Sequence, residues 1–395
     1  MMNLQSRLRA ILDHKAPLVA LGKSQPLRAE PPLEELLPGH WERVGESRCF
    51  VSQHRYALDH RHGAQRLADL AAAPADAWQP FVVGGEGEPF DPLAAVFIDT
   101  ETTGLSRAAG TYCFLVGLGS FEDNAFVVRQ YLMPDFGEEE ALLELVAREI
   151  GPRAGLVSFN GRGFDWPLLE MRYLLARRPA PHRGEPHLDL LHASRRLWRR
   201  RLSSCALSAL EQELLGIQRE EMDVPGALIP QLYLDYVERS RTRPMAQVFY
   251  HNAMDVLSMV ALAARIGAVV ARPAGEQEAQ DLVALGKLYL QQGDYARAEA
   301  AFRAAEAGVG GPGEARLELS FLLKRLGRLD EAMEIWWGEL EGPALHPYVE
   351  LAKQLEHRLG DYGAARRLVA RAIQRVASGH LPCRDPEAVL RELRH

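Results

Sequence analysis

Short apolar runs alternate with amphipathic segments from residue 91 to residue 271. The runs are rich in β-branched and aromatic residues, which is typical of strands, and apolar residues three or four positions apart between them indicate helices. The expected strands lie at 96–101, 112–121, 125–132, 155–160 and 187–191, and the expected helices at 138–150 and through 168–173. A polar turn at 122–124 predicts an antiparallel hairpin. The pattern therefore predicts an α/β domain with a mixed β-sheet flanked by helices.

The pattern changes to helices alone after about residue 278. Turn glycines at Gly293, Gly327 and Gly360 are spaced 34 and 33 residues apart, and a small alanine follows each of them one turn into the next helix. The same apolar slot of each unit is filled by Phe302, Trp336 and Val369. This period predicts three tetratricopeptide-like units in an all-α domain at 278–395, about the minimum number for a stable stack.

Three regions follow from these patterns. Residues 1–90 are rich in proline and predict an N-terminal extension, partly packed on the α/β domain, with one strand at 49–56. The α/β domain covers 91–271 and the repeats cover 278–395. Between them, Pro273 and Gly275 would interrupt a continuous helix, so 272–276 is expected to be a linker.

Composition narrows the class of protein. A chain of 395 residues requires two or three domains, and 47% hydrophobic with 25% charged residues is typical of soluble globular proteins. We expect no membrane-spanning helix and no signal peptide, and hence a cytoplasmic protein. Four cysteines without metal-ligand spacing predict neither a zinc site nor a disulfide framework. A net charge of -7 argues against a surface coated for nucleic acid, but it allows a local basic groove.

Two carboxylates stand at the end of the first expected strand of the α/β domain. Asp99 and Glu101 are two residues apart, so their side chains leave the same face of a strand. They repel each other unless a cation lies between them, and carboxylate oxygens suit Mg²⁺ or Mn²⁺. The alternative is that Asp99 caps a turn and Glu101 is solvated. The polar residues 102–104 that follow, and two acidic motifs downstream, favour the metal.

The downstream motifs lie at a strand-to-helix turn and on a helix. Asn160 and Phe164 precede Asp165, which follows the expected strand at 155–160 and alternatively caps the next helix. His251 and Asp255 are four residues apart and share one face of a helix. Such a pair alone is more often a surface contact, but here it comes third in an ordered series of acidic motifs.

The three motifs together resemble those of the DEDD (DnaQ-like) exonuclease superfamily. Within it, the chain most resembles YprB-like RNase H-fold proteins, which can carry a tetratricopeptide tail. The resemblance covers roughly 40–271 and implies an RNase H-like sheet and two-metal hydrolysis of phosphodiesters. It implies two divalent cations about 4 Å apart, which activate a water and stabilise the leaving 3′ oxygen. The implied metal ligands are Asp99, Glu101, Asp165 and Asp255.

The spacing of the expected general base follows the superfamily pattern less closely than that of the metal ligands does. In the superfamily a His five residues before the last Asp, or a Tyr four before it, positions or deprotonates the water. This chain has the two reversed, with Tyr250 at five and His251 at four. We favour His251, because an unperturbed histidine pKa near about 6.5 suits proton transfer at neutral pH.

Further polar residues are candidates for contacts with substrate or with the ligands. Thr102 and Asn160 are expected to contact substrate, and Asn252 would do so or orient a ligand. Asp189, at the end of the last expected strand, would be a fifth acidic member, a support for a metal ligand or a structural residue.

A basic run with a tryptophan follows at 195–201. Arginines would bind phosphates and the tryptophan would stack a base, whereas the alternative is a solvated helix face with Leu197 and Trp198 packed inward. We expect contact with nucleic acid through Arg195, Arg196, Trp198 and Arg199.

The sequence thus predicts a metal-dependent exonuclease acting on single-stranded DNA or RNA, 3′ to 5′, whose repeats recruit a protein partner. The alternative is a catalytically weak or inactive RNase H-fold protein that binds nucleic acid or acts as a scaffold through its repeats. A third possibility makes the repeats the main functional unit, because repeat stacks present concave surfaces to partner proteins.

Overall fold

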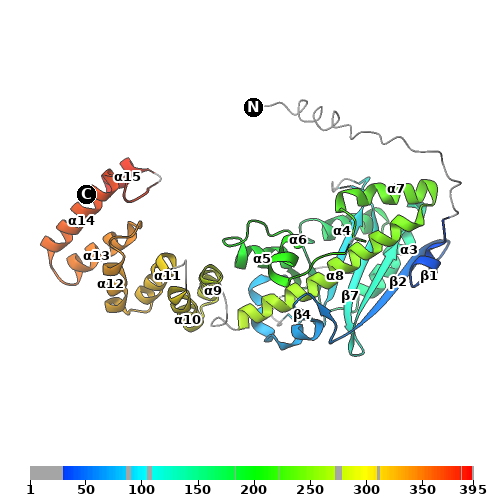
Figure 1. Ribbon diagram of the computed structural model, residues 1–395, viewed down its shortest axis with the longest axis horizontal. Helices are drawn as coiled ribbons and strands as arrows, with labels where there is room; N and C mark the ends of the chain where they lie inside the picture. Colours follow the sequence, from blue (N-terminus) through cyan, green and yellow to red (C-terminus); the bar gives the residue numbers. More distant parts are fainter. Residues whose placement is uncertain are drawn as a thin grey trace, which may run out of the picture.

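The structure is a computed structural model that describes residues 30–85, 90–104, 109–182, 184–220, 222–271, 278–308, 312–383 and 385–393. The first 29 residues and the expected linker at 272–276 lie outside the described residues. Figure 1 shows a larger lobe built on a β-sheet, from which the C-terminal helices extend as an elongated stack.

The sheet has eight strands in the order β1-β2-β8-β7-β6-β9-β10-β5. Their bounds are β1 Gly39–Val44, β2 Ser47–Ala57, β5 Val82–Val83, β6 Val96–Thr102, β7 Cys113–Glu122, β8 Ala125–Leu132, β9 Leu156–Ser158 and β10 His187–Asp189. A separate pair joins β3 Arg61–His62 to β4 Gln65–Arg66. The α-helices of the lobe are α2 Leu33–Leu36, α3 Glu139–Ile150, α4 Asp165–Leu175, α5 Leu190–Trp198, α6 Leu207–Leu210, α7 Ile229–Arg239 and α8 Thr242–Ala271.

Strand directions confirm the RNase H-like mixed sheet. The β6, β9 and β10 strands run parallel, and β6, β7 and β8 are antiparallel neighbours. The predicted hairpin turn is present, with φ values of 45° at Asp123 and 59° at Asn124. These left-handed conformations match the right-handed twist of the flanking strands. Each of the strands expected in the α/β domain is found at its expected place.

Residues from the expected N-terminal extension belong to the same sheet. The β1–β2 hairpin continues it beyond β8, and β5 pairs with β10 at the opposite edge. The strand expected at 49–56 is confirmed within β2, whereas β1 and β5 were not predicted. We therefore propose that the α/β domain begins near residue 30 rather than at residue 91.

Alternation along β6 sends its side chains into two cores. Val96 and Ile98 enter one core, and Phe97 enters the other, on the face from which Asp99 and Glu101 also project. On that face, β7 has glycines opposite Phe97 and Asp99. A Cβ atom on Gly119 would lie 2.6 Å from Cγ1 of Val256 in α8. The glycines therefore allow α8 to lie directly against the strands that carry the acidic residues.

The C-terminal helices pair as the glycine period predicts. Their bounds are α9 Ala279–Gln292, α10 Tyr295–Ala307, α11 Pro312–Arg325, α12 Leu329–Gly338, α13 His346–His357, α14 Tyr362–Ala377 and α15 Pro386–Glu392. Gly293, Gly327 and Gly360 have φ values of 77°, 78° and 66° and end the first helix of each pair. Phe302 and Trp336 are fully buried, whereas Val369 is half-buried.

Direct contacts join the first repeat to the sheet lobe. Both carboxylate oxygens of Asp281 in α9 lie 3.1 Å from Nε of Arg201, just beyond α5. The hydroxyl of Tyr289 donates a hydrogen bond to the carbonyl of Val270 at the end of α8. One hydrophobic core continues from the sheet into the repeats. The repeats are therefore packed on the lobe at its α5 side (Figure 1).

Helix α8 corrects the expectation that the chain has no segment long and apolar enough to span a membrane. Among the described residues it alone passes that test of length and composition. However, 78% of its apolar window is buried inside the protein. It is the central helix of the lobe, and its apolar character follows from that burial.

Replacement of Gly119 by alanine should loosen α8 from the sheet. The new Cβ would clash with Val256 and with the ring of Phe126, so we expect a loss of about 1–3 kcal/mol in the free energy of unfolding. Urea denaturation measures it. Gly110→Ala is the matched control, because nothing lies within 4 Å of a Cβ there. Equal midpoints for the two variants would contradict this account of the contact.

Candidate active site

Asp99 is held at the end of β6 by a buried amide. Nδ2 of Asn252 donates to Oδ2 of Asp99 at 2.8 Å, and Oδ1 of Asn252 accepts from Nε2 of Gln130 at 2.9 Å. Asn252 is fully buried, and Gly117 opposite Asp99 makes room for it. Asn252 therefore orients Asp99 and does not reach substrate.

Glu101 projects from the same face as Asp99, one step further along β6. The pairing with β7 is irregular between Glu101 and Thr102, where the strand ends. Thr102 was expected to contact substrate, and this expectation is wrong. Its side chain is buried, and its hydroxyl donates to the carbonyl of Gly104 at 2.8 Å. Thr102 shapes the turn after the two carboxylates.

Asp165 reaches the cluster from the start of α4. The hydroxyl of Thr100, on β6, donates a hydrogen bond to Oδ1 of Asp165. The preceding turn is held by Asp189, whose oxygens accept from the backbone N–H of Asn160 at 2.9 Å and of Arg162 at 3.3 Å. Asp189 is fully buried and also caps α5. It is therefore a support for the turn that carries Asp165.

Asp255 is brought to β6 by α8. Its Oδ1 accepts a hydrogen bond from Nη2 of Arg219, and its Oδ2 lies 3.7 Å from Nε2 of His251. Nδ1 of His251 lies 2.7 Å from Oδ1 of Asp223. Because a ring N–H donates to a carboxylate, Asp223 fixes the histidine with Nε2 toward Asp255.

The carboxylates are close enough to disturb one another. Burial, followed by the charges of Asp255, Glu101 and Asp165, raises the pKa of Asp99 well above its usual range. Burial and the charges of Asp255 and Asp165 likewise raise the pKa of Glu101. Burial raises the pKa of Asp165 to about 6, against the opposing hydrogen bond from Thr100. Four acidic groups on three elements thus share one site that favours positive charge.

Arg219 was not among the predicted residues, and it supplies a cation to this site. Besides Asp255 it binds Glu211, with Nη2 2.6 Å from Oε1 and Nε 2.9 Å from Oε2. Glu211 is buried and also accepts from the hydroxyl of Ser258 at 2.5 Å. No periodicity or spacing marks Arg219, because the loop that carries it meets α8 only in the folded chain.

The donor set fits a hard divalent cation. Carboxylate oxygens are the preferred ligands of Mg²⁺ and Mn²⁺, and the burial and neighbouring charges that raise the pKa values of Asp99 and Glu101 would favour a cation beside them. Among the described residues, no three His, Cys, Asp or Glu side chains are arranged to coordinate one ion. Instead, Asp99 is hydrogen-bonded to Asn252, Asp165 to Thr100 and Asp255 to Arg219.

A cavity of about 490 Å³ opens beside Asp99 and Asp165. Asn160 and Arg195 line it too, so two of the residues predicted to bind substrate lie next to the carboxylates. Asn160 is exposed and has a φ of 65°, a conformation that asparagine tolerates better than most residues. Tyr250 lines a different cavity, on the side of residues 216–220, whereas His251 contacts the acidic cluster.

The basic run divides into inward and outward residues. Trp198 is 1% exposed and packs in the core with Leu197, so the expectation that it stacks a base is wrong. Arg196 is half-buried, and its guanidinium donates to the carbonyl of Pro80. Arg195 and Arg199 are exposed. The helical period decides this division, because residues one turn apart share a face.

The pH dependence of stability tests the cost of burying the Asp165 carboxylate in the cluster. A carboxyl group with a raised pKa stabilises the fold below its ordinary pKa, and that contribution is lost as the pH rises through about 6 for Asp165. Without divalent cations, Asp165→Asn should therefore unfold at a higher urea concentration than the parent at pH 7.5. We expect a gain of about 1–3 kcal/mol that disappears toward pH 4.

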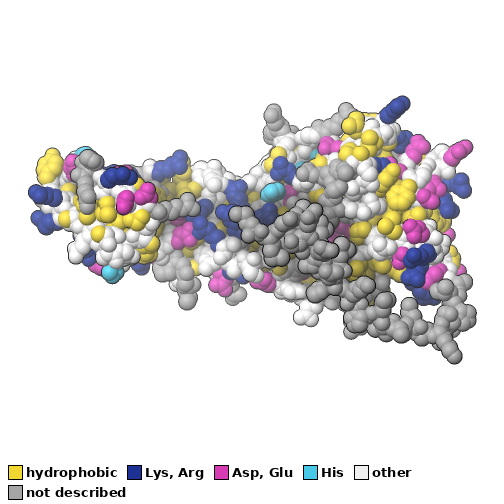
Figure 2. Space-filling model, turned by 90° about the horizontal axis from the view of Figure 1, so that it is seen from above, with side chains coloured by type: hydrophobic (Ala, Val, Ile, Leu, Met, Phe, Trp, Pro, Cys, Tyr) yellow, Lys and Arg dark blue, Asp and Glu magenta, His cyan; other side chains and the backbone are white. Residues whose placement is uncertain are grey.

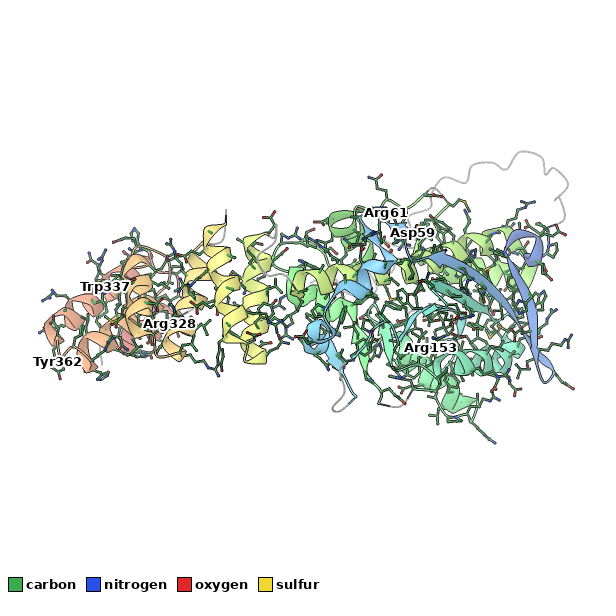
Figure 3. All side chains as sticks on the ribbon, turned by 90° about the horizontal axis from the view of Figure 1, so that it is seen from below. Asp59, Arg61, Arg153, Arg328, Trp337 and Tyr362 are labelled. Atoms are coloured by element: carbon green, nitrogen blue, oxygen red, sulfur yellow. The ribbon has the colours of Figure 1, made fainter. Side chains whose placement is uncertain are left out.

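Asp59→Asn is the control for this comparison, because Asp59 is exposed on the surface of the lobe (Figure 3). A difference between Asp165→Asn and the parent that stays constant from pH 4 to pH 7.5 would contradict the raised pKa of Asp165.

Comparisons with known proteins agree with this architecture. Residues 96–266 match the model of the RNase_H superfamily, and residues 289–335 match a tetratricopeptide repeat model. The chain is 29% identical over 399 residues to the uncharacterized protein YprB of Bacillus subtilis (strain 168), covering 95% of this chain and 94% of that protein. The chain is thus similar over nearly its whole length to that protein, and its own two segments match an RNase_H superfamily model and a tetratricopeptide repeat model in that order.

Proposed function

We propose that the chain is a metal-dependent exonuclease that shortens single-stranded nucleic acid from the 3′ end. The observation that carries the proposal is the gathering of Asp99, Glu101, Asp165 and Asp255 at β6, where burial raises the pKa of all four and the charges of the neighbouring carboxylates raise those of Asp99 and Glu101 further. The RNase H-like sheet supports a nucleic-acid-processing role. The 3′ to 5′ direction is supported by the resemblance of the ordered motifs to the DEDD superfamily.

The four carboxylates would hold two divalent cations, Mg²⁺ or Mn²⁺. Such ions lower the pKa of an attacking water and stabilise the leaving 3′ oxygen. Nε2 of His251 would accept the proton of that water, because Asp223 binds Nδ1 and leaves Nε2 facing Asp255. Asn252 and Gln130 keep the Asp99 carboxylate in one orientation throughout.

Substrate would enter through the cavity beside Asp99. Asn160 supplies a polar side chain there, and Arg195 supplies a positive charge for the phosphate backbone.

On the repeats, Trp337 and Tyr362 are 48% and 69% exposed and support a protein partner for the stack (Figure 3). Nothing in these contacts requires a membrane, and we propose a cytoplasmic site of action.

One observation favours the alternative function. The guanidinium of Arg219 binds Asp255 and Glu211, so a fixed side chain already supplies positive charge to the cluster. A protein that kept this pair would bind nucleic acid or act as a scaffold without cleaving it. We favour the enzyme because Asp99 and Glu101 form no ion pair with a basic side chain among the described residues, and their pKa values are raised although the charge of Arg219 lowers that of Glu101.

Loss of a cluster carboxylate should abolish cleavage. We expect the parent to shorten end-labelled single-stranded DNA or RNA stepwise with Mg²⁺ or Mn²⁺ and not with EDTA. Asp99→Asn and Asp255→Asn should be slower by at least about 10³-fold, because each removes a ligand of the cations. Asp59→Asn should match the parent. Metal-independent cleavage, or full activity in Asp99→Asn, would refute the two-metal proposal.

The two candidates for the general base can be separated by substitution. His251→Ala should lower kcat by about 10²–10⁴-fold, because the group that accepts the proton of the water is removed. Tyr250→Phe should stay close to the parent, because Tyr250 lines another cavity. The reverse order of effects would transfer the role to Tyr250.

A further inference from the structure

A second cavity lies between the sheet lobe and the first repeat. It has a volume of about 520 Å³ and is lined by the outer face of α5 and by one face of α9. Five of its nine lining residues are Arg or Lys, and none of the nine is acidic. Figure 2 shows dark blue Lys and Arg side chains gathered at this junction. On a chain with a net charge of -7, such a concentration of positive charge indicates a site for an anion.

The charges differ in how far the protein itself neutralises them. Nζ of Lys287 lies 2.9 Å from Glu314 and 2.8 Å from Glu318, and Arg200 also pairs with Glu314. The guanidinium of Arg199 forms no hydrogen bond or ion pair with any other described residue, and the same holds for the guanidinium of Arg195. The groove therefore has two paired cations, Lys287 on α9 and Arg200 just beyond α5, and two cations without a side-chain partner, Arg195 on α5 and Arg199 directly after it.

This groove shares one wall residue with the cavity of the candidate active site. Arg195 lines both the groove and the cavity that contains Asp99 and Asp165. Arg199 lies four residues further on, about 6 Å along the helix axis, and Lys287 faces it from α9. The positive charges thus form a line that leads from the carboxylates to the repeats. Such a line suits a nucleic-acid backbone, whose phosphates are regularly spaced.

Contacts across the junction hold the two walls in place. Arg201 binds both oxygens of Asp281, and Tyr289 hydrogen-bonds the end of α8. Arg196 is bonded to the carbonyl of Pro80 and forms part of the wall. Because these groups are buried or partly buried, the groove is a feature of the packed junction and not of freely moving surface side chains.

We propose that α5 and α9 together bind the phosphate backbone of a single-stranded nucleic acid whose end lies at the carboxylate site. The first repeat is then part of the substrate-binding surface. The inference rests on the proposed function, because the proposed function sets the direction in which the strand leaves the site. Its ligand is a strand long enough to reach beyond Arg195.

The test compares strand lengths in the full chain. Fluorescein-labelled oligothymidylates and oligouridylates of 4 and 16 nucleotides are titrated in EDTA, and binding is followed by anisotropy. Arg199→Glu combined with Lys287→Gln should weaken binding of the 16-mer about 10-fold or more and lower its salt slope by about 1.4. The 4-mer, which reaches only the carboxylate cavity, should bind as to the parent. Arg199→Glu is also measured alone. It changes an exposed residue whose side chain has no partner, so it should fold even if the double variant does not.

Arg366→Glu is the matched control, since Arg366 is exposed on α14 at the far end of the stack (Figure 1). Unchanged 16-mer binding in the groove variants, or an equal loss for the 4-mer, would overturn the proposal. Binding of poly-glutamate instead of either oligonucleotide would overturn it in favour of an acidic protein partner.

Cleavage of the 4-mer with Mg²⁺ is measured in parallel. If the parent cleaves neither the 4-mer nor the 16-mer with Mg²⁺ but groove-dependent binding of the 16-mer persists, the nuclease proposal fails and the groove stands. If the parent cleaves the 4-mer and the groove variants bind the 16-mer as tightly as the parent does, the groove proposal fails and the nuclease proposal stands.

Discussion

The repulsion between buried carboxylates at the end of β6 is the constraint on which the rest of the site depends. Asp99 and Glu101 leave the same face of one strand, and Asp165 and Asp255 reach them from α4 and α8. Like charges at such a distance destabilise the fold unless positive charge or protons compensate. Hydrogen bonds from Asn252, Thr100 and Arg219 offset part of this cost.

The architecture follows from bringing α8 onto the acidic strand. Gly117 and Gly119 remove side chains from β7 where α8 crosses it, so Asn252 and Val256 can approach the strands closely. The same helix ends next to α9, where Tyr289 is bonded to it. One helix therefore positions Asp255 at one point and the repeats at another. This shared support is why a groove between α5 and α9 can be aligned with the active site.

The sequence predicts those elements of the fold that follow a local periodicity along the chain. Strands and the glycine-spaced repeats depend on neighbours in the chain, and the acidic motifs stand at strand ends or on one helix face. The assignment of Trp198 and Thr102 to substrate is wrong because their direction depends on packing. Arg219 could not be found, since its partners are 8 and 36 residues away.

Mn²⁺ in a crystal of the full chain, located by anomalous scattering, tests the central claim most directly. The account predicts anomalous density between the carboxylates of Asp99, Glu101, Asp165 and Asp255, with Asp255 no longer bonded to Arg219. Absence of density there at millimolar Mn²⁺, with the bond between Arg219 and Asp255 intact, would contradict it. The carboxylates would then be balanced by the protein alone, and the chain would be a binding protein with an RNase H-like fold.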